Sequence, residues 1–145
     1  MTYGIDTDFL VAVEVREHLF HPQADALLGE LLKADHDLAL APQTLAEFIH
    51  IVTDERRMSR PLEREEAVAR ATHWWEATEV VRVFPDADAT SDFLTWLQRH
   101  RLGRKRLLDT LLAATFYRAG IRRVITNNER DYREFGLFEI LSYKA

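Results

Sequence analysis

The sequence predicts one α/β domain with a parallel sheet over residues 1–145, and three observations support this prediction. Short apolar runs alternate with longer segments in which apolar residues recur every three or four positions. Proline and glycine stand where helices begin and end, as at Pro42 and Gly120. The length of 145 residues, of which 47% are hydrophobic, suits a single core. Strands that alternate with helices pair in parallel through right-handed crossovers.

The first half of the chain contains two predicted strands and two clear helices. Met1–Ile5 is a predicted strand, and the apolar residues at 9–13 begin a helical or buried segment. Pro22–Asp35 is a predicted helix because its apolar side chains recur at i, i+3, i+4 and i+7. The apolar run Leu38–Ala41 leads into a second helix, which opens at Pro42 and carries an apolar stripe formed by Leu45, Phe48, Ile49 and Val52.

The second half repeats this alternation. Three further helices are predicted, at Pro61–Ala77, Asp88–His100 and Leu107–Ala119. Three further strands are predicted where β-branched and apolar residues cluster, at Glu79–Phe84, Val124–Thr126 and Phe138–Leu141.

The composition excludes several classes of protein. The chain has no cysteine, so disulfide scaffolds, thiol nucleophiles and cysteine-ligated zinc are excluded. None of its six histidines pair at metal-ligand spacing. No apolar stretch approaches the roughly 20 residues of a membrane helix, and the first residues lack the basic start of a secretion signal. We therefore expect a soluble, cytoplasmic protein.

The net charge of −5 argues against a protein that binds nucleic acid over its whole surface. One segment, Arg99–Arg106, is nevertheless strongly basic and contains no acid. Without its five cations the net charge of the chain would be −10 instead of −5. This segment is either a solvated loop or a local contact for a phosphate backbone.

Asp109 is the least expected residue of its predicted helix, which is apolar on nearly every side. On a helical wheel it lies between Leu112, Ala113 and Phe116, so its carboxylate is predicted to be buried. A buried carboxylate needs a proton, a hydrogen bond, a cation or a metal ion. The alternative is a first-turn acid that stabilises the helix terminus and pairs with Lys105.

Other polar residues are predicted at the same edge of the sheet. Asp6 ends the first strand, and Glu47 lies in the second turn of the helix that follows the next strand. The strand Val124–Thr126 runs into the polar segment 127–132. Ligands of open parallel sheets bind at the carboxyl ends of the strands, where these positions converge. Taken singly, each position is also explained by helix capping, solvation or turn formation.

Converging carboxylates predict a divalent metal ion. Several acids cannot all stay ionised in a partly dry site unless cations neutralise them. Oxygen ligands without cysteine or paired histidine favour Mg²⁺ or Mn²⁺, which also bind substrate phosphates. Such an ion activates water for attack on phosphorus.

Four segments taken together carry a family resemblance: Gly4–Thr7, Leu45–Phe48, Leu107–Ala114 and Val124–Tyr132. In their order and spacing they resemble the PIN-domain ribonucleases, specifically the VapC-type toxins of bacterial toxin–antitoxin pairs. The resemblance covers nearly the whole chain, although no segment is specific by itself.

The resemblance implies a three-layer α/β/α fold and a Mg²⁺- or Mn²⁺-dependent endoribonuclease that leaves 5′-phosphate and 3′-hydroxyl ends. Its catalytic and metal-binding acids match Asp6, Glu47 and Asp109, with Asp131 as the fourth. The implied partners are RNA, a cognate antitoxin that inserts a cation among the carboxylates, and a second copy of the chain. Further residues are implied in two groups, supporting residues Thr7, Thr126 and Asn128, and RNA-backbone residues Arg101, Arg104, Lys105 and Arg106.

Two positions depart from the family pattern. Asp8 stands where the family commonly has asparagine, and Asn128 stands where its loop often has an acid. Whether Asp131 or Asn128 completes the site is therefore left open, as is the choice between one and two metal ions.

Two other functions compete with this interpretation. Asp6 and Asp8 resemble the nucleophile and acid of a haloacid-dehalogenase-type phosphatase, although the lysine and the late acidic pair of that chemistry are not evident. A non-catalytic PIN-like scaffold, whose acids only cap helices, is the second alternative. Large apolar residues on two helices are predicted to pack in the core, with an interface as the alternative: Trp74, Trp75, Phe93, Leu94, Trp96 and Leu97.

Overall fold

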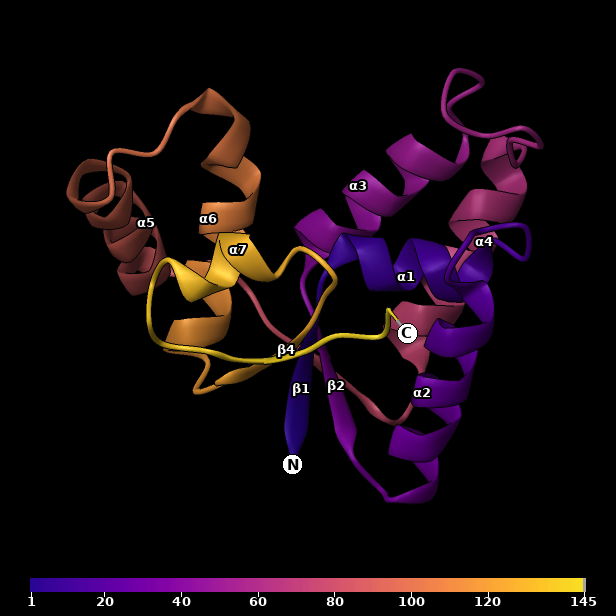
Figure 1. Ribbon diagram of the computed structural model, residues 1–145, viewed down its shortest axis with the longest axis horizontal. Coiled ribbons are helices and arrows are strands. Elements are labelled where there is room, and N and C mark those ends of the chain that lie inside the picture. Colours follow the sequence, from indigo (N-terminus) through magenta and orange to yellow (C-terminus); the bar gives the residue numbers. More distant parts are fainter. Residues whose placement is uncertain (145) are drawn as a thin grey trace.

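A five-stranded sheet lies between two layers of helices in the computed structural model, which describes residues 1–144 (Figure 1). The strands are β1 (Thr2–Ile5), β2 (Asp37–Leu40), β3 (Val80–Arg82), β4 (Arg123–Ile125) and β5 (Glu139–Leu141). The helices are α1 (Thr7–Glu14), α2 (His21–Lys33), α3 (Pro42–Val52), α4 (Arg64–Glu76), α5 (Ala87–Arg99), α6 (Leu107–Arg118) and α7 (Glu129–Arg133), with a 3₁₀ turn η1 at Arg104–Arg106.

The strands are parallel and stand in the order β3-β2-β1-β4-β5, so the first strand is central. Gly4 pairs with Ala39 on one side and with Val124 on the other. Because Ile5 also pairs with Ile125, β1 and β4 end at the same level, and the residues that follow them meet at one edge. The Asp6 amide donates to the Ile125 carbonyl at 3.2 Å and extends this pairing by one residue.

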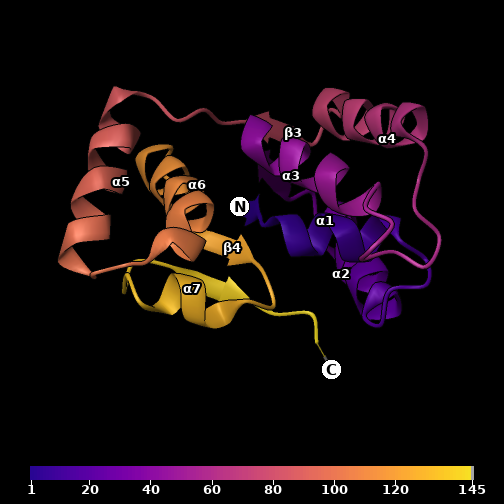
Figure 2. The same ribbon diagram turned by 90° about the horizontal axis from the view of Figure 1, so that it is seen from above.

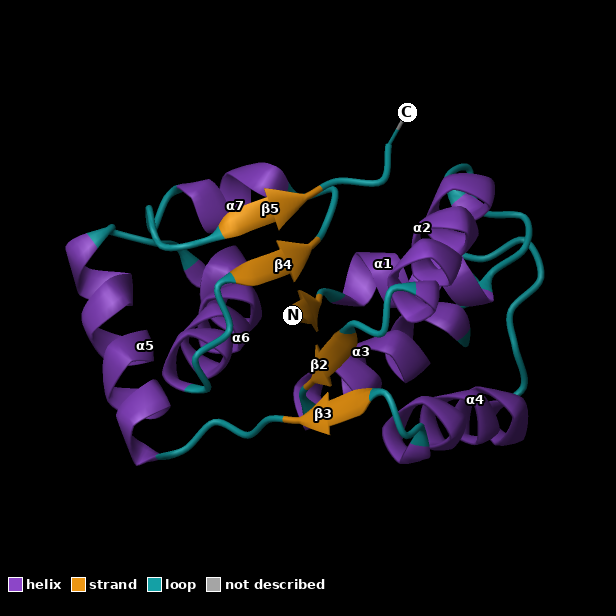
Figure 3. Ribbon diagram, turned by 90° about the horizontal axis from the view of Figure 1, so that it is seen from below, coloured by secondary structure: helices purple, strands orange, loops and turns teal. Residues whose placement is uncertain are grey.

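The two helical layers have separate cores (Figure 2). Helices α1 to α4 pack on one face of the sheet around Phe9, Leu10 and Phe48. Helices α5 to α7 pack on the other face around Trp96 and Phe116. Figure 3 shows the strands between these two groups of helices. The predicted three-layer α/β/α fold is confirmed.

Gly4 allows α6 to approach the central strand closely. A Cβ atom at this position would lie 2.8 Å from the Phe116 ring, which is shorter than real Cβ contacts. Because Phe116 is fully buried in the core of that layer, the ring has no room to retreat. The absence of a side chain at Gly4 therefore sets the distance between β1, which Asp6 follows directly, and α6, which carries Asp109.

The sequence predicted most elements to within a few residues, and the structure corrects two points and decides a third. The helix expected from Pro61 begins at Arg64, because the preceding Leu62 amide donates to the Val52 carbonyl. Residues 129–133, expected as part of a polar loop, form the short helix α7. The undecided segment 9–13 lies in helix α1.

The prediction that the large apolar residues pack in the core is correct for Trp74 and Trp96. Trp74 and Trp96 are buried, one in each core, whereas Leu94 is 57% exposed and lies outside the core. Within residues 1–144, no helix is long and apolar enough to cross a lipid bilayer.

Candidate functional site

Five carboxylates from four elements gather where the strands end, and we call them the acid edge: Asp6, Asp8, Glu47, Asp109 and Asp131. Asp6 follows β1, and Glu47 lies on α3, which follows β2. Asp109 lies in the first turn of α6 and Asp131 in α7. Figure 1 shows β1 running into α1 and β2 running into α3 at this edge.

Asp6 is the most deeply buried of the five, with 5% of its surface exposed. One carboxylate oxygen accepts from the Thr7 amide at 2.9 Å and caps α1, and the other accepts from the Thr126 hydroxyl at 2.7 Å. Burial first, and then the charge of Asp8, raises the pKa of Asp6 well above its ordinary value. The charge of Asp109 acts in the same direction, so the two predicted acids influence each other across the edge.

Thr126 is fully buried and connects three parts of the site. While its hydroxyl donates to Asp6, the same oxygen accepts from the Asn128 amide at 2.9 Å. This pair of hydrogen bonds fixes the turn after β4 against the end of β1. The predicted supporting role of Thr126 is therefore that of a structural connection, which holds both the loop and a carboxylate.

Asp8 also belongs to the site, although the ligands predicted from the sequence do not include it. Its carboxylate accepts from the Phe9 amide at 2.9 Å and from the Asn127 amide at 2.8 Å. Burial raises the pKa of Asp8, and the Asn127 amide opposes this shift. The signal in the sequence was its position two residues after Asp6.

Asn127 was also missed, and it fixes the end of the chain. Its side-chain oxygen accepts from the Ser142 hydroxyl and from the amides of Tyr143 and Lys144 at 2.9 to 3.1 Å. Since its own amide donates to Asp8, Asn127 connects the C-terminal segment to the acid edge.

Asp109 lies half-buried, opposite Glu47 and Asp131. Burial, followed by the negative charges of Asp131 and Glu47, raises the pKa of Asp109 to about 6. Arg106 acts in the opposite direction. The predicted burial of Asp109 is thus only partial, because its first-turn position leaves one side open to water.

Arg106 connects the start of α6 to α7. Its guanidinium pairs with Glu134 at 2.6 Å and with Asp131 at 3.5 Å, and it donates to the Asp131 carbonyl at 2.7 Å. Only 18% of the Arg106 side chain is exposed. This arginine therefore braces Asp131, while the other predicted RNA-backbone residues, Arg101, Arg104 and Lys105, are exposed on the adjoining segment.

The two remaining supporting residues occupy different environments. Thr7 is buried, and its hydroxyl has no hydrogen-bond partner among residues 1–144, while its amide donates to the Asp6 carboxylate that caps α1. The Asn128 side chain is exposed and makes no cap bond to α7, so only its amide contributes to the site.

The chemistry of the acid edge fits a hard divalent cation. All candidate ligands are oxygens, and carboxylates that raise one another's pKa are stabilised by added positive charge. In the part of the chain that the structure describes, no three acidic or histidine side chains form a ready-made metal cage. Mg²⁺ tolerates this arrangement, because it binds through one or two carboxylates and keeps several waters.

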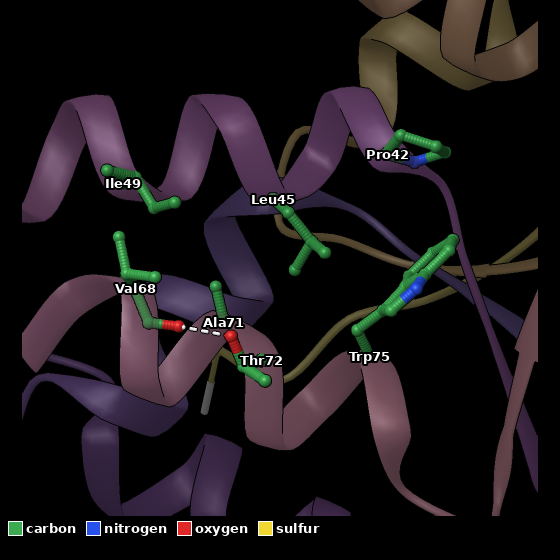
Figure 4. A pocket seen from close by; sticks show the side chains of 7 residues that line it. All are labelled: Pro42, Leu45, Ile49, Val68, Ala71, Thr72 and Trp75. Atoms are coloured by element: carbon green, nitrogen blue, oxygen red, sulfur yellow. Dashed lines mark hydrogen bonds between the residues drawn. The ribbon is translucent and has the colours of Figure 1, made fainter.

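An apolar hollow lies elsewhere. It measures about 270 Å³ between α3 and α4 and contains no ionisable side chain in its lining (Figure 4). Its walls include Leu45 and Ile49, from the apolar stripe of α3, and Trp75 from α4. Because the hollow offers no acid, base or nucleophile, the acid edge remains the chemically equipped region.

Comparison with known proteins agrees with this arrangement. The model of the PIN domain family matches residues 3–136. The chain belongs to the PIN domain family. This PIN domain is 26% identical over 137 residues to Ribonuclease VapC24 of Mycobacterium tuberculosis, with 94% of this chain and 93% of that protein covered.

Solved structures of VapC proteins share the fold of this PIN domain. VapBC2 from Rickettsia felis, bound to a DNA fragment from its promoter, superposes with a TM-score of 0.70 at 17% identity and covers 99% of this chain and 100% of its own. VapC20 of Mycobacterium tuberculosis, a toxin that cleaves the sarcin–ricin loop, superposes with a TM-score of 0.65 at 20% identity, covering 86% and 87%. The resemblance to VapC-type PIN proteins is confirmed, and neither alternative function gains support.

Proposed function

We propose that this PIN domain is a Mg²⁺- or Mn²⁺-dependent endoribonuclease, the toxin of a toxin–antitoxin pair that acts in the cytoplasm. The observation that carries this proposal is the gathering of five carboxylates from separate elements, close enough for the charges of their neighbours to raise the pKa values of Asp6 and Asp109. Ion pairing with Arg106 does not explain this gathering of carboxylates. The arginine lowers the pKa of Asp109, but burial and the neighbouring carboxylates outweigh it, so the pKa stays raised. The similarity to a protein named as a ribonuclease supports RNA as the substrate.

We assign Asp6, Glu47 and Asp109 to hold the ion, directly or through its bound waters, with Asp131 as the fourth acid. When bound, the ion lowers the pKa of a water molecule and offsets negative charge on the phosphate. Asp131 accepts a hydrogen bond from the attacking water, since its carboxylate faces Asp109 and its backbone is held by Arg106.

The other residues of the site position these groups. Thr126 and the Thr7 amide fix the Asp6 carboxylate, so its orientation is set before substrate arrives. Arg101, Arg104 and Lys105 hold the RNA backbone through contacts that read no sequence. Arg106 was also predicted to bind the RNA backbone, but its guanidinium is engaged with Asp131, and its main role is to hold that residue in place.

The test is cleavage of a structured RNA by the purified protein, with metal removed by EDTA and then restored. Cleavage should vanish in EDTA, return with Mg²⁺ or Mn²⁺, and leave 5′-phosphate ends. Asp109→Asn should reduce the metal-restored rate at least about 100-fold, because a ligand charge is lost. Asp88→Asn is the matched control, since Asp88 is the first-turn acid of α5 and is exposed.

Two results would contradict the proposal. One is cleavage that continues in EDTA at the rate measured with Mg²⁺. The other is full activity of Asp109→Asn, with circular dichroism showing that both variants are folded.

A protein antitoxin and a second copy of the chain are the partners we propose. Support for the antitoxin comes from the structural relatives, of which several are complexes of a toxin with its antitoxin. The acid edge is suited to inhibition by an arginine or lysine of the antitoxin, because a cation relieves the repulsion among its carboxylates. Co-expression with the product of a short neighbouring reading frame should yield a stable complex without ribonuclease activity, and separate elution of the two proteins would count against it.

A further inference from the structure

Tyr132 carries a polar atom that the fold leaves unused. The side chain is 1% exposed, and its hydroxyl has no hydrogen-bond partner among residues 1–144. Buried polar groups are nearly always paired, because an unpaired one has lost its water without compensation. Phenylalanine would fill the same space without this cost.

The ring of Tyr132 is anchored in the core, and this anchoring fixes the position of its hydroxyl. It packs edge-to-face on Phe138, with 5.7 Å between ring centroids, in the core that also contains Phe116 and Leu112. Its backbone belongs to α7, next to Asp131, whose carbonyl Arg106 holds at 2.7 Å. The phenol is therefore a rigid group beside the acid edge.

The surroundings of the phenol are negatively charged. Burial, then the charge of Asp6, and then that of Asp109, raises the pKa of Tyr132 well above its usual range, and Asp8 and Asp131 add to this effect. Four members of the acid edge are thus close enough for their charges to act on this one hydroxyl. An unpaired phenol O–H beside carboxylates is a hydrogen-bond donor without an acceptor.

We propose that Tyr132 is a positioning residue of the metal site, whose hydroxyl donates to the carboxylates from the buried side when they bind a divalent ion. This inference rests on the proposed function. Hydrogen bonds to the ligands of a metal orient them, and their loss typically weakens metal binding about 10- to 100-fold. Tyr132 approaches from the core, whereas Thr126 holds Asp6 from the β4 side.

The experiment compares wild-type protein with Tyr132→Phe, which removes one oxygen atom. Isothermal titration with MnCl₂ alone, without RNA, should show a Kd about 10-fold weaker in the variant. Its melting temperature in EDTA should be equal to or above that of the wild type, because the unpaired hydroxyl is gone. Tyr117→Phe is the control, since this residue lies in the last turn of α6 against Trp96, and it should bind Mn²⁺ like the wild type.

A second measurement does not depend on the Tyr132 variant. The chain has four tyrosines, so labelling with ¹³Cζ-tyrosine gives four resonances; Tyr3→Phe, Tyr117→Phe and Tyr143→Phe assign three of them, and the fourth belongs to Tyr132. Titration with MgCl₂ should shift the Tyr132 resonance and leave those of Tyr3 and Tyr117 in place. This readout decides the matter even if Tyr132→Phe fails to fold.

The outcomes separate the two proposals. Equal Mn²⁺ affinity in wild type and Tyr132→Phe, or a Tyr132 resonance that ignores Mg²⁺, overturns the positioning role and leaves the proposed function intact. A wild-type protein that binds neither ion overturns the proposed function, and this inference with it.

Discussion

The acid edge has two halves that the chain supports differently. Asp6 and Asp8, beside β1 and β4, are surrounded by donors at 2.7 to 2.9 Å: Asp6 accepts from one backbone amide and one hydroxyl, and Asp8 accepts from two backbone amides. Glu47, Asp109 and Asp131, on three helices, are more exposed, and Arg106 is the cation beside them. The first half has its hydrogen bonds before any ligand arrives, whereas the second half contains facing carboxylates.

This difference indicates a division of labour. The first half is a rigid frame, by which we mean Asp6, Asp8 and their hydrogen-bond donors. It is rigid because these residues follow strands β1 and β4, which are paired in register. Like charges in the second half cost stability that a cation would restore, which is typical of functional sites and not of cores. Three predictions test the comparison, beginning with the frame.

The largest effect is expected from Thr126→Val, which keeps the shape of the side chain and removes its hydroxyl. The Asp6 oxygen would lose its partner in a buried place, and the Asn128 amide would lose its partner in a partly buried one. We expect a loss of about 2 kcal/mol in the free energy of unfolding, measured with urea, since buried groups left unpaired cost about 1–3 kcal/mol.

Thr115→Val is the matched control for this substitution. Thr115 is also fully buried, but its hydroxyl donates within α6 to the Leu111 carbonyl at 2.8 Å. Its replacement should cost less than about 1 kcal/mol, because that carbonyl also belongs to the helix ladder. If both variants lose the same free energy of unfolding, the hydrogen bonds of Thr126 contribute no more to stability than an ordinary hydroxyl within a helix.

The second prediction concerns the pH dependence of the other half. The pKa of Asp109 is raised from 3.8 to about 6, so the folded protein holds this proton more tightly than the unfolded chain. In EDTA, this residue therefore lowers the free energy of unfolding progressively as the pH rises from about 4 to 6. The full shift corresponds to about 3 kcal/mol, and partial exposure to water reduces our expectation to about 1–2 kcal/mol.

The variant Asp109→Asn isolates this effect. It should be more stable than wild type at pH 7.5 in EDTA, equally stable near pH 4, and insensitive to Mg²⁺ at either pH. Urea denaturation across this range measures the difference. A variant that is less stable than wild type at pH 7.5 would show that the carboxylate is a structural cap.

Local patterns predicted the elements and the principal acids of this molecule. Asp109 stood out because it interrupts an apolar helix, and Asp6 because it ends an apolar strand. Helix α7 was missed, since five residues are too few to show a periodicity and Asn127-Asn128 indicates a turn.

Contacts between distant parts of the chain could not be predicted in this way. Thr126 and Asp6 are 120 residues apart, and no local pattern specifies that bond. The strand order that places β1 beside β4 is likewise a property of the whole sheet. Tyr132 was read only as part of a polar segment, because its missing hydrogen-bond partner becomes visible only in the packed core.

The smallest effect is expected at the basic segment beside the second half. Arg104 and Lys105 are exposed, whereas Arg106 is engaged with Asp131 and Glu134. The double variant Arg104→Ala/Lys105→Ala should raise KM for RNA a few-fold, leave kcat nearly unchanged, and reduce the slope of log KM against log salt by about 1 to 1.5. Arg56→Ala/Arg57→Ala, on the loop between α3 and α4, is the control for the loss of two positive charges. If both double variants change the salt slope equally, RNA responds to the overall charge and the segment is a solvated loop.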